Sequence, residues 1–211
     1  MSTSEQQLRT GADELGIAVT DAEYTALLGY LSLLQKWNKA YNLTAIRDEP
    51  GMVALHLLDS LAVHPAVKSA NNIIDVGTGP GLPGMVLAIM NPEKRFTLLD
   101  SNGKKTRFMF QAKTSLGLDN VTIINDRVEA YHPPQPFDMV ISRAFASLAD
   151  MTSWCQHLRA DKGCFLAMKG QYPQQEIDDL KGRFEVSQVT ELRVPGVDGE
   201  RHLLRLMPVV S

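Results

Sequence analysis

The segment IIDVGTGPGLPG, from Ile73 to Gly84, decides the fold of this chain. It begins within an apolar run, NNIIDV, and runs without polar alternation are typical of strands buried on both faces. Glycines at positions 77, 79 and 81 follow, and Pro83 lies where the first turn of a helix tolerates proline. A strand, a glycine turn and a helix in this order indicate the ligand-binding turn of an open α/β sheet, whose ligands lie at the carboxyl ends of the strands.

The same pattern continues toward the C-terminus. Further apolar runs follow, namely RFTLLD, NVTIIN, FDMVISR, GCFLAMK, FEVSQVTEL and HLLRLMPV. Between the first five strands we predict helices over residues 83–90, 103–116, 127–131 and 148–158. This alternation predicts a parallel sheet with helices on both faces and right-handed crossovers. The last two runs, joined by VPGVDGER, predict an antiparallel hairpin at a sheet edge, so the α/β sheet has seven strands, mostly parallel.

The first 68 residues have a helical period instead. Apolar residues between Tyr24 and Tyr41 recur mostly at spacings of three and four, and Thr20 with Glu23 forms a capping box. A further helix is predicted over residues 52–63, ahead of Pro65. We therefore expect a helical N-terminal region over residues 1–68, packed on a Rossmann-like domain over residues 69–211. The length of 211 residues suits one structural domain overall.

Composition excludes several classes of protein. The chain is 44% hydrophobic and 21% charged, as globular proteins are, its first ten residues show no apolar run after a basic start, and it has no apolar stretch of about 20 residues. We expect a cytoplasmic protein with no membrane contact. A net charge of −3 argues against coating nucleic acid by bulk charge, so such contact has to be local. Cys155 and Cys164 have neither metal-ligand nor disulfide-framework spacing, and we expect reduced thiols and no metal.

Two classes of cofactor fit a glycine turn of this kind, dinucleotides and S-adenosylmethionine. Asp100 ends the next strand, where a carboxylate accepts hydrogen bonds from ribose hydroxyls. Pro80 and Pro83 remove backbone N–H donors that a pyrophosphate needs, and Asp75 adds a negative charge beside it. The same Asp75 suits a ligand with a cationic amino group and a sulfonium. We therefore favour S-adenosylmethionine over NAD.

The methyl acceptor is inferred from the segment FDMVISRAF, at the end of the fourth strand. It lacks the Asx-Pro-Pro-aromatic sequence of enzymes that methylate exocyclic amino groups of bases. Neither cysteine lies at the expected ligand rim, which argues against a nucleophilic cysteine. An acceptor that is already nucleophilic remains, and N7 of guanine fits, because its attack needs orientation and not proton removal. We accordingly identify no general base, and the catalytic residues stay unknown.

A basic segment follows Asp100. Residues 101–117 contain four basic side chains and no acidic one, and their N-terminal end lies beside the predicted cofactor rim, where phosphates would be gripped. Lys169, at the end of the fifth strand, faces the same rim. We expect Lys104, Lys105, Arg107 and Lys169 to contact RNA, and an ordinary solvated helix face is the alternative for the basic segment.

Eight ordered motifs resemble the ribosomal RNA small subunit methyltransferase G family, also called RsmG or GidB, and the resemblance covers the chain from about residue 15 to residue 207. They are WNKAYNLTAIRD, HLLDSLAV, IDVGTGPGLPG, FTLLDSNGKK, DRVE, VISRAFASL, MKGQ and VPGVDGERHL. The resemblance implies a class I S-adenosylmethionine-dependent methyltransferase fold with a small helical N-terminal region. It also implies methyl transfer to N7 of one guanine in a hairpin loop of bacterial 16S rRNA. The substrate form stays open between naked RNA, the 30S subunit and an assembly intermediate.

The resemblance also implies positions that contact the cofactor. They are Gly77, Leu82, Val128, Glu129 and Arg143, to which the residue-based argument adds Gly79 and Asp100. Asp126 departs from the family, in which many relatives have Ser or Gly before the Arg-Val-Glu segment. Two other classes stand as alternatives, an NAD-dependent oxidoreductase and a non-catalytic RNA-binding ribosome assembly factor. Calorimetry with NADH and with S-adenosylmethionine separates the first from a methyltransferase, and labelled methyl transfer to RNA separates the second.

Overall fold

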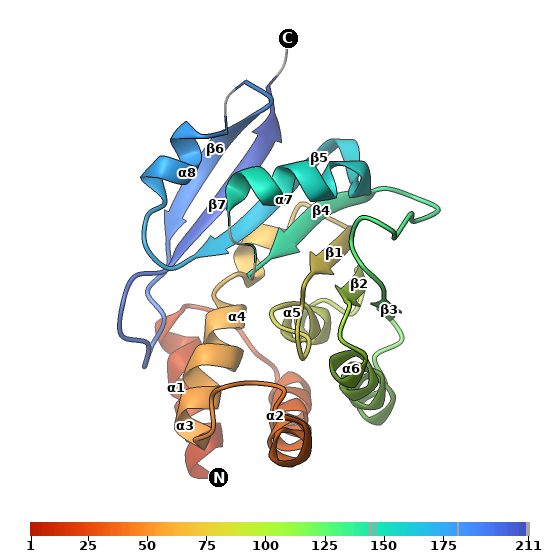
Figure 1. Ribbon diagram of the computed structural model, residues 1–211. Coiled ribbons are helices and arrows are strands. Elements are labelled where there is room, and N and C mark those ends of the chain that lie inside the picture. The colour runs from red at the N-terminus through yellow and green to blue at the C-terminus, as the bar shows by residue number, and fades with distance from the viewer. Residues whose placement is uncertain (144, 146, 181, 210–211) are drawn as a thin grey trace.

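The computed structural model describes residues 1–143, 145, 147–180 and 182–209. Its centre is a seven-stranded sheet of order β3-β2-β1-β4-β5-β7-β6 (Figure 1). The first five strands pair in parallel, and β7 runs antiparallel to both β5 and the edge strand β6. The predicted parallel sheet with an edge hairpin is confirmed. The strands are β1 (Asn72–Val76), β2 (Arg95–Asp100), β3 (Val121–Asn125), β4 (Phe137–Ser142), β5 (Arg159–Lys169), β6 (Phe184–Glu191) and β7 (His202–Pro208).

Successive residues of the central strands pack into two different cores. Ile73 belongs to one hydrophobic cluster and Ile74 to the other, and Ile141 and Val140 divide between the clusters in the same way. Side chains of a strand point alternately to the two sides of a sheet. Both faces are covered here, so the strands are apolar at nearly every position, as the sequence predicted.

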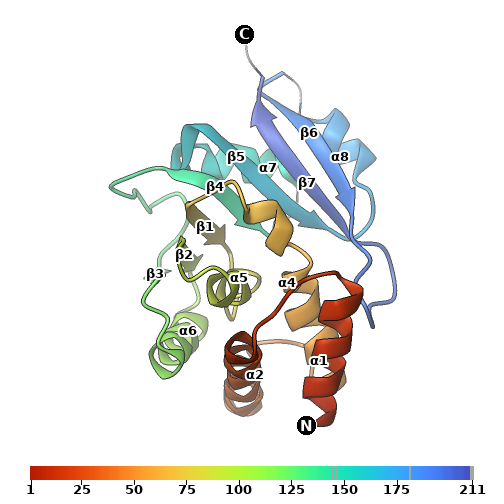
Figure 2. The ribbon, with the colours of Figure 1, turned by 180° about the vertical axis from the view of Figure 1, so that it is seen from behind.

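Helices cover the two faces in separate groups. On one face lie α5 (Gly84–Met90) and α6 (Gly103–Leu116), together with the N-terminal helices α1 (Thr3–Glu14) and α2 (Asp21–Tyr41). On the other face lie α7 (Leu148–Cys155) and α8 (Gln174–Asp178) (Figure 2). The N-terminal helices share one continuous hydrophobic cluster with the sheet, which contains Leu8 and Leu27 as well as Ile73.

The N-terminal region is helical, and its local signals act as the sequence predicts. Thr20 and Glu23 form both hydrogen bonds of the capping box at the start of α2. The helix expected over residues 52–63 is built from α3 (Glu49–Met52), the π-helical turn η1 (Val53–Leu58) and α4 (Asp59–Leu61), and the 3-10 turn η2 (His64–Val67) follows. π-helical turns occur frequently at functional sites, and this one carries His56 and leads into Asp59.

Two of the helices expected from the sequence differ in the structure. The short helix predicted over residues 127–131 is wrong, because these residues form turns, with Ala130 N and Tyr131 N both bonded to the Arg127 carbonyl. The segment is too short to propagate as a helix and runs into a proline pair. The helix predicted over residues 148–158 ends as α7 at Cys155 and continues as the 3-10 turn η3 (Gln156–Leu158).

In the part of the chain that the structure describes, no helix is long and apolar enough to cross a membrane. The same residues contain no group of His, Cys, Asp and Glu side chains suited to hold a metal ion. Cys155 and Cys164 are free thiols and both are buried.

Candidate cofactor site and its neighbour

Asp100 supports the glycine loop from the end of β2. Its Oδ2 accepts a hydrogen bond from Gly79 N at 2.8 Å, and its Oδ1 accepts one from Asn102 N at 2.8 Å. Gly77 and Gly79 have φ angles of 64° and 63°, which favour glycine. Asp100 is 8% exposed, so this carboxylate joins the loop to β2 at the carboxyl edge of the sheet.

Asp75 supports the same loop from beneath. Its Oδ2 accepts hydrogen bonds from Thr78 Oγ1 at 2.7 Å and from Gly84 N at 2.8 Å. The side chain is fully buried, and this burial raises the pKa of its carboxyl to about 7. The sequence-based interpretation gave Asp75 to a cationic ligand, whereas in the structure it binds its own loop.

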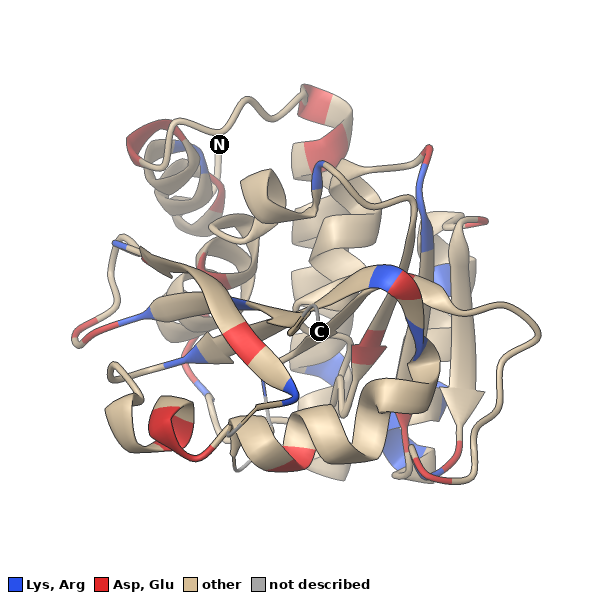
Figure 3. Cartoon of the chain, turned by 90° about the horizontal axis from the view of Figure 1, so that it is seen from above, with Lys and Arg blue, Asp and Glu red and all other residues tan. Residues whose placement is uncertain are grey.

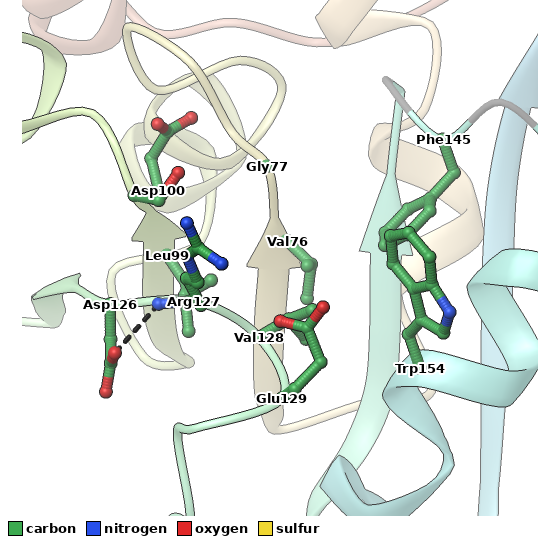
Figure 4. Close-up of a pocket in the computed structure, with 11 residues that line it drawn as sticks. Val76, Gly77, Leu99, Asp100, Asp126, Arg127, Val128, Glu129, Phe145 and Trp154 are labelled. Atoms are coloured by element: carbon green, nitrogen blue, oxygen red, sulfur yellow. Dashed lines mark hydrogen bonds between the residues drawn. The ribbon is translucent and has the colours of Figure 1, made fainter.

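A cavity of about 350 Å³ opens at the carboxyl ends of β1 and β2 (Figure 4). Val76, Leu99 and Val128 supply apolar surface, and the Phe145 and Trp154 rings lie on the side opposite the 126–129 loop, with centroids 5.9 Å apart. Carboxylates accept hydrogen bonds from hydroxyl and amino groups, and apolar walls hold a flat ring. The full lining is Val76, Gly77, Leu99, Asp100, Ser101, Asp126, Arg127, Val128, Glu129, Phe145 and Trp154.

The cavity brings together part of the predicted cofactor set. Gly77, Asp100, Val128 and Glu129 all line it, although they come from three separate segments of the chain. The other three predicted residues, Gly79, Leu82 and Arg143, do not. The Gly79 N–H donates to Asp100 Oδ2, Leu82 is buried in the core, and Arg143 lines a neighbouring cavity.

Some lining residues were missed by the sequence reasoning. Phe145 belongs to the motif VISRAFASL, which indicates the family but predicts no role for this ring. Residues 144 and 146 of that motif lie outside the described residues. Trp154 had no sequence signal, because only the packing of α7 against the sheet brings it to the cavity.

The neighbouring cavity has a volume of about 280 Å³, and three of its four charged lining residues are basic. The charged lining residues of the first cavity are mostly acidic. Asp59 is the centre of the neighbouring cavity, with Oδ1 3.1 Å from Arg201 Nε and Oδ2 3.4 Å from Arg143 Nη1. Lys169 pairs with Glu176 at 2.8 Å and donates to the Phe145 carbonyl at 3.3 Å. The cavity is lined by Ile46, Leu55, His56, Asp59, Arg143, Met168, Lys169, Gly170 and Arg201.

The basic segment after Asp100 forms the start of α6. The side chain of Asn102 caps this helix by accepting hydrogen bonds from the backbone N–H groups of Lys104 and Lys105. Lys104 and Arg107 are exposed and Lys105 is half-buried. Elsewhere, positive and negative residues are interspersed along the chain (Figure 3).

Comparison with known proteins relates this geometry to a family. The family model for rRNA small subunit methyltransferase G matches residues 23–204. The chain is 54% identical to the ribosomal RNA small subunit methyltransferase G of Alteromonas mediterranea, over 97% of this chain and 98% of that one. It is 55% identical to the protein of the same name from Salmonella arizonae, over 91% and 92% of the two chains.

Solved structures with the same fold are more distant in sequence. A glycopeptide N-methyltransferase, MtfA, in complex with S-adenosyl-L-homocysteine, matches with a TM-score of 0.60 at 10% identity, over 72% of this chain and 90% of that one. The ribosomal protein L11 methylase of Lactobacillus delbrueckii matches with a TM-score of 0.58 at 15% identity, over 72% and 77%. The fold is therefore that of class I methyltransferases. Because the family model matches residues 23–204, and because the two relatives named methyltransferase G cover 97% and 91% of this chain at 54% and 55% identity, this protein belongs to the rRNA small subunit methyltransferase G family.

Proposed function

We propose that this protein transfers a methyl group from S-adenosylmethionine to N7 of a specific guanine in 16S rRNA. Family membership supports the methyltransferase activity and the small-subunit rRNA substrate. The observation that carries the proposal is the cavity at the carboxyl ends of β1 and β2, where Gly77, Asp100, Val128 and Glu129 meet. This is the edge at which open α/β sheets bind their ligands.

The residues of this cavity fit S-adenosylmethionine. The ligand carries ribose hydroxyls and an amino group as donors, and the Asp100 and Glu129 carboxylates that line the cavity are acceptors. Its adenine is flat and apolar on both faces, and Val128 offers apolar contact beside Leu99. When bound, this cofactor supplies an electrophilic methyl group on sulfur. Gly79 and Leu82 would affect cofactor binding indirectly, through the shape of the glycine loop. Arg143 would act from the neighbouring cavity, in the segment that follows β4.

The direct test is methyl transfer to ribosomal RNA. The enzyme is incubated with methyl-labelled S-adenosylmethionine and with 30S subunits, naked 16S rRNA or assembly intermediates from cells that lack it, and the labelled base is then mapped. We expect one N7-methylguanine, and comparison of the three substrates identifies the natural one. A substrate within ribosomal particles also implies a cytoplasmic protein. Binding of NADH in place of S-adenosylmethionine would support an oxidoreductase, and RNA binding without label transfer would support a non-catalytic assembly factor.

The choice of N7 makes a prediction about pH. The lone pair of N7 is available at neutral pH, so the chemical step requires no deprotonation of the target. The single-turnover rate should stay nearly constant from about pH 6 to 8.5. A rise of one decade per pH unit would show that the acceptor loses a proton, and the N7 assignment would then be withdrawn.

A matched pair of variants tests the cofactor placement. Glu129→Gln removes a charged acceptor from the cavity, and we expect S-adenosylmethionine affinity to fall by about tenfold or more, measured by calorimetry. Glu93→Gln makes the same change on an exposed side chain ahead of the amino end of β2 and should leave the affinity unchanged.

A further inference from the structure

The smaller cavity adjoins the proposed cofactor site through one short segment. The chain that follows β4 contributes Arg143 to the wall of the smaller cavity and Phe145 to the wall of the larger one. Lys169, from the end of β5, lines the smaller cavity and donates to the Phe145 carbonyl at 3.3 Å. Both cavities thus open at the carboxyl edge of the sheet, on either side of this segment.

Asp59 organises the smaller cavity at a considerable cost in solvation. Its side chain is 4% exposed, and it faces two guanidinium groups from distant parts of the chain, Arg143 and Arg201. A carboxylate buried against partly exposed guanidinium groups recovers its desolvation cost only in part, so stability alone explains this cluster poorly. Its geometric effect is to fix the direction of both arginine side chains.

The described residues leave part of the Arg201 guanidinium without a partner. Its Nε donates to Asp59 Oδ1 and its Nη1 donates to the Glu200 carbonyl, whereas its Nη2 has no hydrogen-bond partner among the residues that the structure describes. The side chain is 28% exposed and lines the cavity. A guanidinium held by one edge presents its remaining N–H groups in a fixed direction.

His56 shows that the cavity wall has an uncharged polar side as well. The imidazole is buried, with Nε2 2.8 Å from Thr44 Oγ1, and its Nδ1 has no hydrogen-bond partner among the described residues. Burial and the nearby Arg143 charge lower its pKa to about 4, so the ring is neutral at physiological pH. The ring therefore contributes a neutral polar group to the lining of the cavity.

We propose that this cavity receives the methyl-accepting guanine, and that Asp59 is a positioning residue that holds Arg201 so that Arg201 donates to O6 of the base. The inference rests on the function proposed above. O6 lies beside N7 on the same edge of guanine, and arginine is the side chain most often used to recognise this edge. A donor at O6 therefore orients N7 toward the neighbouring cofactor cavity.

The charges in the cavity suit the reaction. The N7 lone pair forms the bond to the methyl carbon while the carbon–sulfur bond breaks with its electrons going to sulfur. The positive charge thereby passes from the sulfonium to the guanine ring, and no proton moves. The Asp59 carboxylate offsets part of the arginine charge that would otherwise oppose a cationic base, and the neutral His56 imidazole adds no further positive charge.

The first experiment measures single-turnover methyl transfer at saturating S-adenosylmethionine and saturating 30S subunits. Arg201→Gln should lower the rate about 10- to 100-fold, and Asp59→Asn should lower it in the same direction. Both variants should bind S-adenosylmethionine as the wild type does and keep its circular dichroism. Arg95→Gln, an exposed arginine at the amino end of β2, is the matched control and should keep the wild-type rate. A wild-type rate in Arg201→Gln would overturn the proposal.

The second experiment separates recognition of the base from a phosphate contact. The target guanine is replaced by 2-aminopurine, which keeps N7 and lacks O6. The wild type should be slowed by this replacement, whereas Arg201→Gln should be slowed no further. Equal slowing of both enzymes, or a loss in Arg201→Gln confined to RNA affinity and its salt dependence, would assign Arg201 to the backbone and overturn the proposal. If the wild type methylates no rRNA at all, the proposed function itself fails, and this outcome is distinct from both.

Discussion

At the scale of single residues, the two aspartates that accept hydrogen bonds from the glycine loop have different surroundings. Asp100 lines the cavity, whereas Asp75 is fully buried below the loop, where Thr78 and Gly84 donate to one of its oxygens. Its other oxygen, Oδ1, has no hydrogen-bond partner among the described residues. A half-satisfied buried carboxylate is more stable protonated than ionised, which agrees in direction with its raised pKa.

Asp75 therefore makes the folded state less stable as pH rises. Its folded-state pKa of about 7 lies above the ordinary value of 3.8, so the folded protein binds more protons between these values. The contribution of Asp75 to the free energy of unfolding should fall by about 4 kcal/mol between pH 4 and pH 8. Asp75→Asn cannot ionise, so its stability relative to the wild type should increase over this range in urea unfolding.

The control for this measurement is Asp119→Asn, which removes an exposed carboxylate after α6. Its stability difference from the wild type should be nearly independent of pH. A constant difference for Asp75→Asn as well would show that this carboxyl ionises as easily in the folded protein as in the unfolded one.

At the scale of elements, α6 joins the cofactor edge to the proposed RNA surface. Asn102 caps the helix directly after Asp100, and the exposed basic residues lie in its first turns. The positive end of the helix dipole adds to their charge, so phosphate groups are favoured there. A local patch of this kind is compatible with a chain whose net charge is −3.

Removing two of these charges should weaken RNA binding in a salt-dependent way. We expect Lys104→Ala with Lys105→Ala to lower the affinity for 16S rRNA and to reduce the slope of log affinity against log salt by about 0.7 to 0.9 for each lost phosphate contact. Cofactor affinity should change little, as calorimetry would show. Lys162→Ala with Arg95→Ala removes the same charge at the amino ends of β5 and β2 and should keep the slope. An unchanged slope in the α6 variant would mean that this face is only solvated.

A hydrogen bond links α2 to the glycine loop. The Tyr30 hydroxyl donates to the Pro80 carbonyl at 2.9 Å, and both residues are buried. Tyr30→Phe leaves this carbonyl unpaired, which should lower the free energy of unfolding by about 1–3 kcal/mol. Because Pro80 lies within the loop, S-adenosylmethionine affinity should fall as well. Unchanged affinity with lowered stability would restrict this bond to a structural role.

At the scale of the whole molecule, the N-terminal region and the sheet share a core. Trp37 of α2 packs against Phe108 of α6, with ring centroids 5.8 Å apart, and the cluster around them includes strand residues. Elements that share one core lose their packing together when the protein unfolds. This supports the prediction that residues 1–68 and 69–211 form one structural domain.

The two tryptophans of the chain make this prediction measurable. Trp37 reports on α2 and Trp154 reports on α7, on the opposite face of the sheet. Each of the variants Trp154→Phe and Trp37→Phe keeps one tryptophan. In both, the denaturation midpoint from tryptophan fluorescence should equal the midpoint from circular dichroism. An earlier loss of the Trp37 signal would show that the N-terminal region unfolds independently.

The sequence by itself determined the parts of this protein that depend on local patterns. Apolar runs, turn residues and the Thr20 capping box predicted the strands, their mostly parallel order and the helical N-terminal region. The ordered motifs indicated the family, and the glycine turn with Asp100 predicted a cofactor site at the edge of the sheet where the structure has the larger cavity. These signals depend on residues close together in the sequence, because the hydrogen bonding and side-chain periodicity of helices and strands act over short sequence separations.

Only the tertiary structure decided which distant side chains meet. It brought Trp154 to the larger cavity, turned Asp75 under the loop, and gathered Asp59, Arg143 and Arg201 around the smaller cavity. The sequence separations among these three residues are large, and no periodicity relates them. Their meeting depends on strand order and on the π-helical turn before Asp59, because these set the direction in which each side chain points.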